Sequence, residues 1–418
     1  MADVQRTEIT VAEARAFVLA KISPMGLETV FLLDSRERVL AEDLVATRPI
    51  PPWDNSAMDG YAVRFADLVA GARLEVLEEI LAGAVPTKKI GSGQATKIMT
   101  GAPMPEGADT VLPVELTESA TEISVVVGAG AKLPVKNENV RYAGEDIRPG
   151  ETVIANGSVM SPAAIGVAAS LGRATVRVFQ RPRVAVLSTG DEIAEVGTVA
   201  HAGQIYTSNS YTLCAAILRA GGIPTYLGIA SDTREDLHAK LAAARSCDMI
   251  VSTGGVSVGD ADFVKQVLQE LGGEMQFWRV AQRPGYPLAF GMIGRTPAFG
   301  LPGNPVSTMV SFEQYVQPAI LRMQGRTQLY PPVVQAILED DVRTRPGKLY
   351  FLRGVVTREG NGFRVRSTGG QGSGILTSML HGNGLILIAP EKSGAKKGDS
   401  VPVQIIDPGF WLGATPGF

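Results

Sequence analysis

The chain has 418 residues, of which 45% are hydrophobic and 19% are charged. This composition is sufficient for packed cores and argues against disorder, and the length predicts roughly two to four domains. The 39 basic and 42 acidic side chains give a net charge of −3, which argues against a nucleic-acid partner because such binding needs clustered positive charge. Since there is no apolar run of about 18 residues and no signal-peptide pattern at the start, we expect a cytoplasmic protein with no membrane partner.

The first part of the chain shows two helical segments with a β-like stretch between them. Thr10 and Glu13 have the spacing of a capping box and predict a helix after Thr10. In SPAAIGVAASLG, Ser161 precedes a proline and Gly172 ends the segment, which predicts a second helix. The intervening apolar runs are short and are separated by Pro/Gly turns. We therefore predict a discontinuous, helix-containing linker domain and an all-β insertion domain, at residues 1–48 with 150–178 and at residues 49–149.

Strand and helix patterns alternate from about residue 179. Strands are expected at RVAVLSTG, IPTYLGIA, DMIVSTGG and TPAFGLPG, and the helices are expected to start at Ser208 or Asn209, at Asp232 and at Asn304. The segment DADFVKQVLQELGG is also expected to be helical. Such alternation predicts a parallel, doubly wound sheet. We assign residues 179–329 to this α/β domain and residues 330–418 to a β-rich C-terminal domain.

Two of the predicted strand-to-helix loops carry glycines followed by carboxylates. In STGDE, Gly190 precedes Asp191 and Glu192, and in STGGVSVGDADF paired glycines precede Asp260 and Asp262. Glycines let the backbone approach a ligand and expose N–H donors to an anion. Carboxylates beside a phosphate require a cation between them, and hard oxygen ligands indicate Mg²⁺. The pattern predicts a metal-bridged phosphoanhydride, although the same aspartates would also serve as helix caps.

Other stretches are less specific. LPGNPVS places Gly303 and Ser307 where a strand gives way to a helix, and RPGYPLAFG supplies Arg283 in what we interpret as a loop. The sequence has no HExxH motif, nucleophile elbow, P-loop or dinucleotide fingerprint. These absences argue against a histidine-ligated zinc site and against hydrolase, NTPase and dinucleotide-binding functions.

The motifs DNSAMDGYA, MTGAPMPEGADTV, GEDI, STGDE, STGGVSVGDADF, PGYPLAFG, LPGNPVS and GSGILTSM occur in this order along the chain. With them the chain resembles the MoeA family of molybdopterin molybdenumtransferases over essentially its whole length. The resemblance implies a multidomain α/β protein with a doubly wound MoaB/MogA-like domain and a C-terminal β-barrel-like domain. It also implies a homodimer whose active site is shared between subunits, with the upstream molybdopterin adenylyltransferase as a candidate partner. The implied reaction inserts molybdenum from molybdate into adenylyl-molybdopterin and releases AMP, with Mg²⁺ as cofactor.

The family motifs also assign roles to residues. The implied catalytic residues are Asp59, Thr100, Glu192, Asp232 and Asp262, and the implied metal ligands are Glu192, Asp260 and Asp262. The implied substrate contacts are Ser188, Thr189, Gly190, Gly254, Gly255, Ser257, Asp260, Arg283, Pro302, Gly303, Asn304 and Ser307. The oxyanion is assigned to Tyr286, Pro287, Lys348 and Ser378.

Two positions depart from the family pattern, and the second of them removes a positive charge. Members usually read K-P-G-K-P where this chain has R-P-G-Y-P, so Tyr286 replaces a lysine. Tyrosine donates one hydrogen bond but carries no positive charge. Two alternatives therefore stay open: a paralogue that handles tungstate or another oxyanion, and a non-catalytic pterin-binding scaffold.

Overall fold

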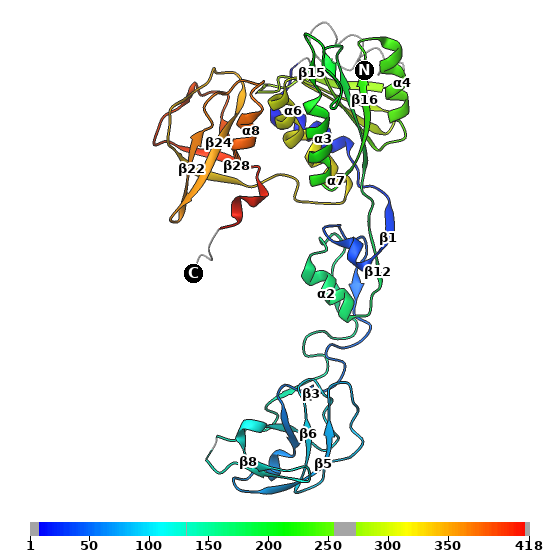
Figure 1. The fold of residues 1–418 in the computed structure, drawn as a ribbon, viewed down its shortest axis with the longest axis vertical. Coiled ribbons are helices and arrows are strands. Elements are labelled where there is room, and N and C mark those ends of the chain that lie inside the picture. The colour runs from blue at the N-terminus through cyan, green and yellow to red at the C-terminus, as the bar shows by residue number, and fades with distance from the viewer. Residues whose placement is uncertain (1–7, 131, 255–272, 414–418) are drawn as a thin grey trace. The chain divides into compact units, whose positions relative to one another are not determined.

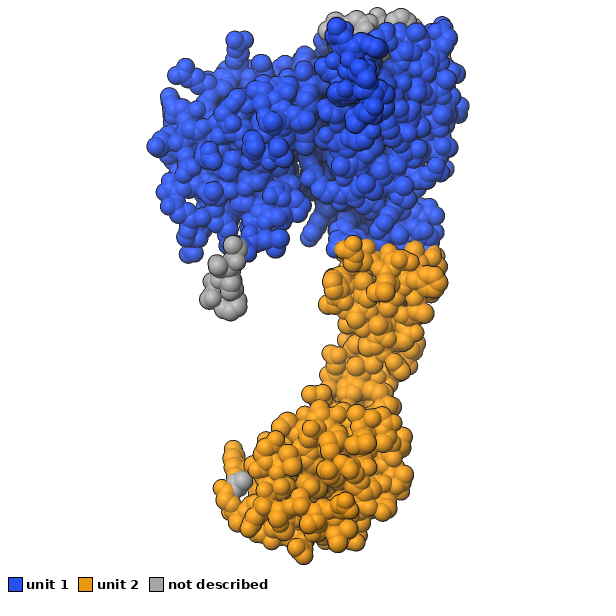
Figure 2. All heavy atoms as spheres, in the orientation of Figure 1, with its two compact units in different colours: residues 1–28, 37–39, 178–418 blue, residues 29–36, 40–177 orange. Residues whose placement is uncertain are grey.

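The computed structural model describes residues 8–130, 132–254 and 273–413. The chain divides into two compact units, which Figure 2 shows in different colours. Unit 1 comprises Met1–Glu28, Glu37–Val39 and Val178–Phe418, and unit 2 comprises Thr29–Arg36 and Leu40–Arg177. The paired strands β1 (Leu27–Phe31) and β12 (Thr175–Phe179) carry the chain from one unit to the other.

Unit 1 contains a six-stranded sheet with the order β16-β13-β17-β21-β20-β18. Its strands are β13 (Arg183–Thr189), β16 (Ile223–Ala230), β17 (Met249–Thr253), β18 (Gly273–Arg279), β20 (Pro287–Ile293) and β21 (Thr296–Leu301). β16, β13, β17 and β21 run parallel, as the sequence predicts, whereas β20 runs antiparallel to both of its neighbours, β21 and β18. The interpretation of RPGYPLAFG as a loop is therefore wrong beyond Tyr286, because Leu288 and Phe290 are buried in the sheet.

Different helices cover the two faces of this sheet (Figure 1). Neighbouring residues of a strand point to opposite faces, and Val184 and Val186 accordingly join one core cluster while Ala185 and Leu187 join another. The first cluster includes residues of α1 (Val11–Lys21), α3 (Ser208–Arg219), α6 (Pro305–Ser311) and α7 (Gln317–Met323). The second includes residues of α4 (Arg234–Ala244). Helices on both faces confirm the doubly wound architecture.

The helix starts agree with the sequence prediction where a local capping hydrogen bond sets them. The capping box of Thr10 and Glu13 is present at α1. In contrast, α3 follows Thr207 rather than Ser208 or Asn209, and the cap of α4 is Thr233, whose side chain accepts from the backbone N–H of Asp236. The helix expected after Asn304 is interrupted by a π-helical turn, Phe312–Val316, between α6 and α7. The predicted helix DADFVKQVLQELGG lies outside the described residues.

A closed β-barrel forms the C-terminal part of unit 1, as the resemblance implies. Its strands are β22 (Val333–Leu338), β24 (Leu349–Glu359), β25 (Gly362–Ser367), β26 (Gly384–Ile388) and β28 (Ser400–Ile405). The order β24-β25-β22-β28-β26 closes through a second pairing of β24 with β26. Two short strands, β23 (Val342–Arg343) and β27 (Gly394–Ala395), and the helix α8 (Thr377–His381) complete it. The strand β19 (Gln282–Arg283) pairs with β24 and ties the α/β part to the barrel.

Unit 2 is mainly β-structure. Its six-stranded sheet has the order β7-β4-β6-β5-β9-β8, with strands β4 (Gly60–Val63), β5 (Arg73–Ile80), β6 (Gln94–Ile98), β7 (Thr110–Pro113), β8 (Thr117–Ala120) and β9 (Ser124–Val127). Two strand pairs and one helix lie outside this sheet: β2 (Leu44–Val45) with β11 (Thr152–Ile154), β3 (Asn55–Ser56) with β10 (Val140–Arg141), and α2 (Pro162–Ser170). Ser161 caps α2 as expected, by accepting from the backbone N–H of Ala164. In the described part of the chain no helix is long and apolar enough to cross a membrane.

Candidate functional site

A cavity of about 620 Å³ lies where the parallel strands of unit 1 end; we call it the strand-end cavity. It contains many of the residues expected to contact a substrate: Ser188, Thr189, Gly254, Pro302, Gly303, Asn304 and Ser307, together with Glu192 and Pro287. This location follows from topology, because the carboxyl ends of parallel strands meet at one edge of the sheet. Gly190, Asp232 and Arg283 are not among its lining residues, and Gly255 and Ser257 lie outside the described residues.

Gly190 and Gly254 lie at this edge in backbone conformations that favour glycine. Their amides, however, do not face an anion as the sequence predicts. Gly254 has φ +88°, and a Cβ there would collide with the carbonyl oxygen of Thr189. Gly190 has φ +133°, and a Cβ there would collide with the carboxylate of Glu192. The N–H groups expected to face an anion are already occupied, since Gly190 donates to Ala230 O at 3.3 Å and Gly254 donates to Leu301 O at 3.2 Å. In this conformation the two glycines provide close packing, and their amides are not free donors.

Hydroxyl groups form the floor of the cavity. The Oγ of Ser188 lies 2.6 Å from Ser210 Oγ and 3.1 Å from Thr207 Oγ1, and all three residues are buried. These hydroxyls satisfy one another and fix the start of α3 against the end of β13. Thr189 differs, because its buried Oγ1 has no hydrogen-bond partner within the described residues. A buried hydroxyl without a partner costs free energy, so a ligand that supplies one would be favoured.

Carboxylates lie beside the cavity. Glu192 lines it, and its carboxylate has no hydrogen-bond or salt-bridge partner among the residues the structure describes. Asp191 and Asp232 form two reciprocal hydrogen bonds. The backbone N–H of Asp191 donates to Asp232 Oδ2 at 3.4 Å, and the backbone N–H of Asp232 donates to Asp191 Oδ1 at 3.1 Å. Asp232 thus holds the Asp191 loop and does not cap α4.

The described carboxylates only partly fit a divalent cation. No group of three potential metal ligands occurs within the described ranges, and Asp260 and Asp262 lie outside them. However, Mg²⁺ typically takes one or two protein carboxylates and completes its shell with water and substrate oxygens. The unpartnered Glu192 supplies one such oxygen donor at the cavity.

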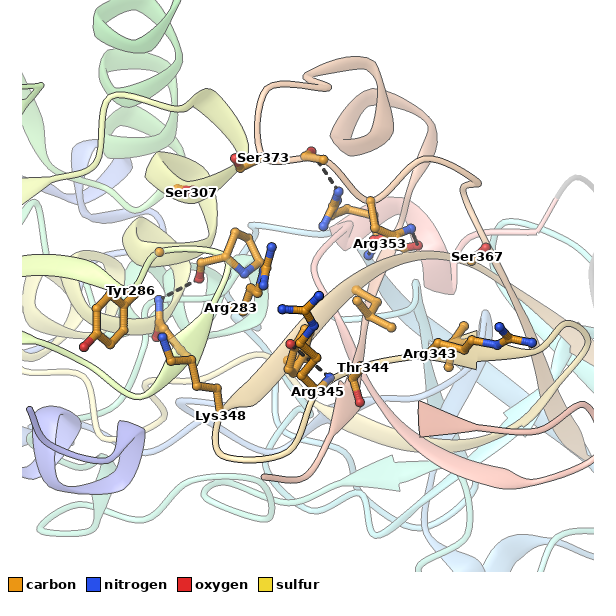
Figure 3. A pocket seen from close by; sticks show the side chains of 18 of the residues that line it. Arg283, Tyr286, Ser307, Arg343, Thr344, Arg345, Lys348, Arg353, Ser367 and Ser373 are labelled. Atoms are coloured by element: carbon orange, nitrogen blue, oxygen red, sulfur yellow. Dashed lines mark hydrogen bonds between the residues drawn. The ribbon is translucent and has the colours of Figure 1, made fainter. Parts of the chain in front are cut away.

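A second cavity, of about 870 Å³, lies between the α/β part and the barrel; we call it the basic pocket. Five cationic side chains line it, namely Arg283, Arg343, Arg345, Lys348 and Arg353, together with one carboxylate, Asp341. None of the five forms a salt bridge within the described part of the chain. Figure 3 shows Arg283, Arg345 and Lys348 gathered on one side of this pocket, with Arg353 and Ser373 on another. The basic pocket shares Pro287, Asn304 and Ser307 with the strand-end cavity.

Arg353 is the most unusual of these cations. Its side chain is only 1% exposed, although it projects from β24 without a carboxylate partner in the described residues. Its Nε donates to Ser378 Oγ at 3.0 Å and one terminal nitrogen donates to Gly372 O at 3.1 Å. Burial lowers the pKa of Arg353 to about 10, so the guanidinium remains charged at neutral pH. A buried cation without a counter-ion is costly, and its position therefore favours an anionic ligand.

The residues proposed for the oxyanion occupy different places. Pro287, Tyr286 and Lys348 line the basic pocket, but Ser378 does not; it is buried beneath Arg353 and donates its own hydroxyl to Ile375 O at 2.6 Å. The Tyr286 hydroxyl donates to Glu8 Oε2 at 2.7 Å, and Lys348 Nζ lies 3.3 Å from the centre of the Tyr286 ring. Tyr286 thus holds Lys348 by a cation–π contact, and its hydroxyl is already engaged.

Unit 2 carries the remaining two predicted residues, Asp59 and Thr100, in mutual contact. Asp59 Oδ1 accepts from both the backbone N–H and the Oγ1 of Thr100, each at 2.7 Å. These hydrogen bonds, the backbone one first, lower the pKa of Asp59. Asp59 therefore stays ionised under all near-neutral conditions, and it is fixed in direction although it is exposed.

Thr100→Ala should raise the pKa of Asp59 only part of the way to its ordinary value. The substitution removes the hydroxyl donor but keeps the backbone N–H, which is the larger cause of the shift. Since the folded pKa is depressed, the contribution of these bonds to stability is present above the ordinary pKa and is lost as pH falls through the folded one. Carboxyl ¹³C NMR titration of both variants measures the shift. An unchanged Asp59 titration in Thr100→Ala would show that the hydroxyl bond does not form in solution.

Sequence reasoning missed several residues of both cavities. Tyr206, Thr207, Asn209 and Thr253 line the strand-end cavity, and Asn209 Nδ2 donates to Gly303 O at 2.7 Å. The available signal was their position at the ligand edge of the sheet, because Thr253 ends β17 and the other three lie at the start of α3 or just before it. In the basic pocket the missed residues are Arg343, Arg345, Arg353 and Ser373. Nothing in the strand pattern YFLRGVV marks its arginine as facing a pocket.

Taken together, the fold and the two cavities define a multidomain α/β protein with a cation-lined pocket between a doubly wound sheet and a β-barrel. Three sequence models of known families match the chain. They are described as the MoeA N-terminal region (domain I and II), a probable molybdopterin binding domain, and the MoeA C-terminal region (domain IV), and they match residues 9–172, 185–322 and 335–406.

Relatives and solved structures agree. A molybdopterin molybdenumtransferase of Haemophilus influenzae is 36% identical over 401 residues, which cover 95% of this chain and 98% of that protein. The molybdopterin molybdenumtransferase 2 of Mycobacterium tuberculosis is 38% identical over 370 residues, covering 86% and 90%. A crystal structure of a molybdopterin biosynthesis MoeA protein from Pyrococcus horikoshii aligns with a TM-score of 0.82 and 32% identity, covering 96% of this chain and all of that one. The chain belongs to the MoeA family.

Proposed function

We propose that this chain is a molybdopterin molybdenumtransferase, an enzyme of molybdenum cofactor biosynthesis. In the proposed reaction the phosphoanhydride of adenylyl-molybdopterin is cleaved, AMP leaves, and molybdenum from molybdate is inserted into the pterin dithiolene. The named relatives support the reaction class. The observation in the molecule that best supports it is the basic pocket, with its buried and unpaired Arg353, adjoining the strand-end cavity.

The arrangement suits two anionic reactants that must meet. Molybdate is a dianion, and the basic pocket offers guanidinium donors that match tetrahedral oxyanions. The nucleotide would occupy the strand-end cavity, where Thr189 offers an unpaired hydroxyl and Asn304 and Ser307 form the boundary with the basic pocket. Binding at both places brings the oxyanion next to the pterin end of the substrate, so that orientation supplies part of the rate.

Carboxylates would bind the metal ion that neutralises the negative charge of the anhydride. We propose Glu192, with Asp260 and Asp262, as ligands of Mg²⁺, which would offset the charge that develops on the departing phosphate oxygen. Asp232 orients the Asp191 loop through its backbone contacts. From the resemblance we further propose a cytoplasmic homodimer in which Asp59 and Thr100 of the partner's insertion domain complete the site. The resemblance is likewise the basis for the division into four domains and for contact with the upstream adenylyltransferase.

The test is release of AMP from adenylyl-molybdopterin by the purified chain with Mg²⁺ and either molybdate or tungstate. We expect release that depends on molybdate and fails without Mg²⁺. Because Tyr286 replaces a lysine, a preference for tungstate would instead indicate the paralogue with altered oxyanion specificity. Binding of the nucleotide without release under any condition would contradict the transferase and favour a scaffold.

A further inference from the structure

Three large apolar residues line the strand-end cavity. They are Ile193 of β14 (Ile193–Ala194) and Ile205 and Tyr206 of β15 (Ile205–Tyr206). Ile205 is 61% exposed and Tyr206 is 49% exposed. The rest of the lining consists mainly of hydroxyl, amide, glycine and proline groups. A large aromatic residue that lines a polar cavity and is half-exposed gains stability when a flat apolar group covers it.

Local hydrogen bonds hold these three residues in place. β14 and β15 are parallel neighbours with Ala194 opposite Tyr206, and the backbone N–H of Ile205 donates to Glu192 O at 2.8 Å. The Tyr206 hydroxyl donates to Thr198 O at 3.0 Å, which fixes the far end of the ring. An aromatic ring anchored at its backbone and its hydroxyl presents a face at little entropic cost.

Glu195, the residue after β14, anchors this strand pair to the body of the domain. Its carboxylate accepts from Tyr226 OH at 2.6 Å and from Tyr211 OH at 3.1 Å. Tyr211 is half-exposed like Tyr206, but it does not line the cavity. Tyr211 of α3 therefore has a structural neighbourhood, whereas Tyr206 of β15 lines the ligand space.

We propose that Tyr206 is the stacking platform for a planar heteroaromatic ring of the substrate. This proposal rests on the proposed function, because adenylyl-molybdopterin carries two such rings, adenine and pterin. Stacking on an aromatic face tolerates different ring systems, so the geometry defines the chemistry of the subsite. The cavity volume of about 620 Å³ accommodates a ring together with the attached phosphate.

Equilibrium binding separates ring recognition from phosphate recognition. The probes are AMP, neopterin as a free pterin, and ribose 5-phosphate, which lacks a ring; the variants are Tyr206→Ala, Tyr206→Phe and the control Tyr211→Ala. We expect Tyr206→Ala to weaken the binding of AMP or of neopterin by about 5- to 100-fold. The affinity for ribose 5-phosphate should stay within about twofold of the wild-type value. Tyr206→Phe and Tyr211→Ala should retain wild-type affinity for the ring probes. The ring probe that loses affinity identifies the ring bound there.

Three results would overturn the assignment. They are unchanged ring binding in Tyr206→Ala, an equal loss for ribose 5-phosphate, and no binding of either ring probe to the wild-type chain at millimolar concentration. Because these are binding measurements, they are independent of turnover. If Tyr206→Ala loses ring affinity but the wild-type chain releases no AMP, the subsite is supported and the transferase is contradicted. If Tyr206→Ala still releases AMP with an unchanged KM, the transferase is supported and the subsite is contradicted.

Discussion

Arg353→Met is expected to reduce molybdate-dependent AMP release by at least about 30-fold, and by as much as several thousand-fold. Removing one partner of a buried, hydrogen-bonded charge pair costs about 2–5 kcal/mol, and among the described residues Arg353 is the one fully buried cation that lines the basic pocket. The loss should appear in the concentration of molybdate needed for half-maximal rate. Affinity for AMP alone should change little, since Arg353 does not line the strand-end cavity.

Stability distinguishes this outcome from misfolding. Replacing a buried, unpaired charge by an apolar side chain of similar length is often neutral or stabilising, so the melting temperature of Arg353→Met should be equal to or above that of the wild type. Arg358→Met is the matched control, because Arg358 lies on the same strand, is exposed and does not line the pocket. Wild-type molybdate dependence in Arg353→Met would show that the oxyanion binds elsewhere.

The same residue gives a pH prediction. Burial depresses the pKa of Arg353 to about 10, below the usual value for arginine. For a base with a lowered folded pKa, the cost of burying the charge is present below that pKa and is relieved as pH rises through it. Between pH 6 and 8 the guanidinium stays charged, so the molybdate-induced rise in melting temperature should be constant in this window if Arg353 is the only titrating contact. It should decline as pH approaches 10.

Local patterns predicted the elements whose chemistry is contained in a few consecutive residues. The caps of α1 and α2 are of this kind, because a side chain and an N–H three residues later decide each of them. Asp232 has the same spacing to Glu235 yet does not cap α4, since its carboxylate contacts the backbone of Asp191, 41 residues away in sequence. Such a preference depends on tertiary proximity, which no local pattern contains. The antiparallel strand β20 was missed for a related reason, because prolines and glycines at its start resemble a turn.

The residues of the candidate site also fall into those that the sequence could predict and those that it could not. Residues at the ends of predicted parallel strands, such as Ser188 and Gly303, could be placed at one edge because sheet topology fixes where strand ends meet. The basic pocket could not be predicted, because it depends on how the barrel packs against the α/β part through β19 and β24. In the sequence Arg353 is one charge within an apolar strand. Only the packing shows that its charge faces a cavity and lacks a counter-ion.

Glu192→Gln is expected to lower AMP release by about 100-fold or more while the fold keeps its stability, since metal-assisted charge neutralisation is worth several kcal/mol. The substitution preserves the size of the side chain, and the Glu192 carboxylate has no partner within the described residues that its loss would leave unpaired. We also expect a higher Mg²⁺ concentration for half-maximal rate. Affinity for ribose 5-phosphate in the absence of Mg²⁺ should not fall, because removing a negative charge beside the anion reduces repulsion.

Glu195→Gln is the matched control, three residues further along the chain. Its carboxylate accepts hydrogen bonds from Tyr226 and Tyr211 and does not line the strand-end cavity, so its replacement should lower the melting temperature by about a few degrees and change AMP release much less than Glu192→Gln does. The two variants thus separate the observables: one loses rate and keeps stability, and the other loses stability and keeps most of the rate. If Glu192→Gln keeps the full rate and the wild-type Mg²⁺ dependence, the carboxylate at the cavity takes no part in cleavage of the anhydride. The metal would then depend on carboxylates other than Glu192.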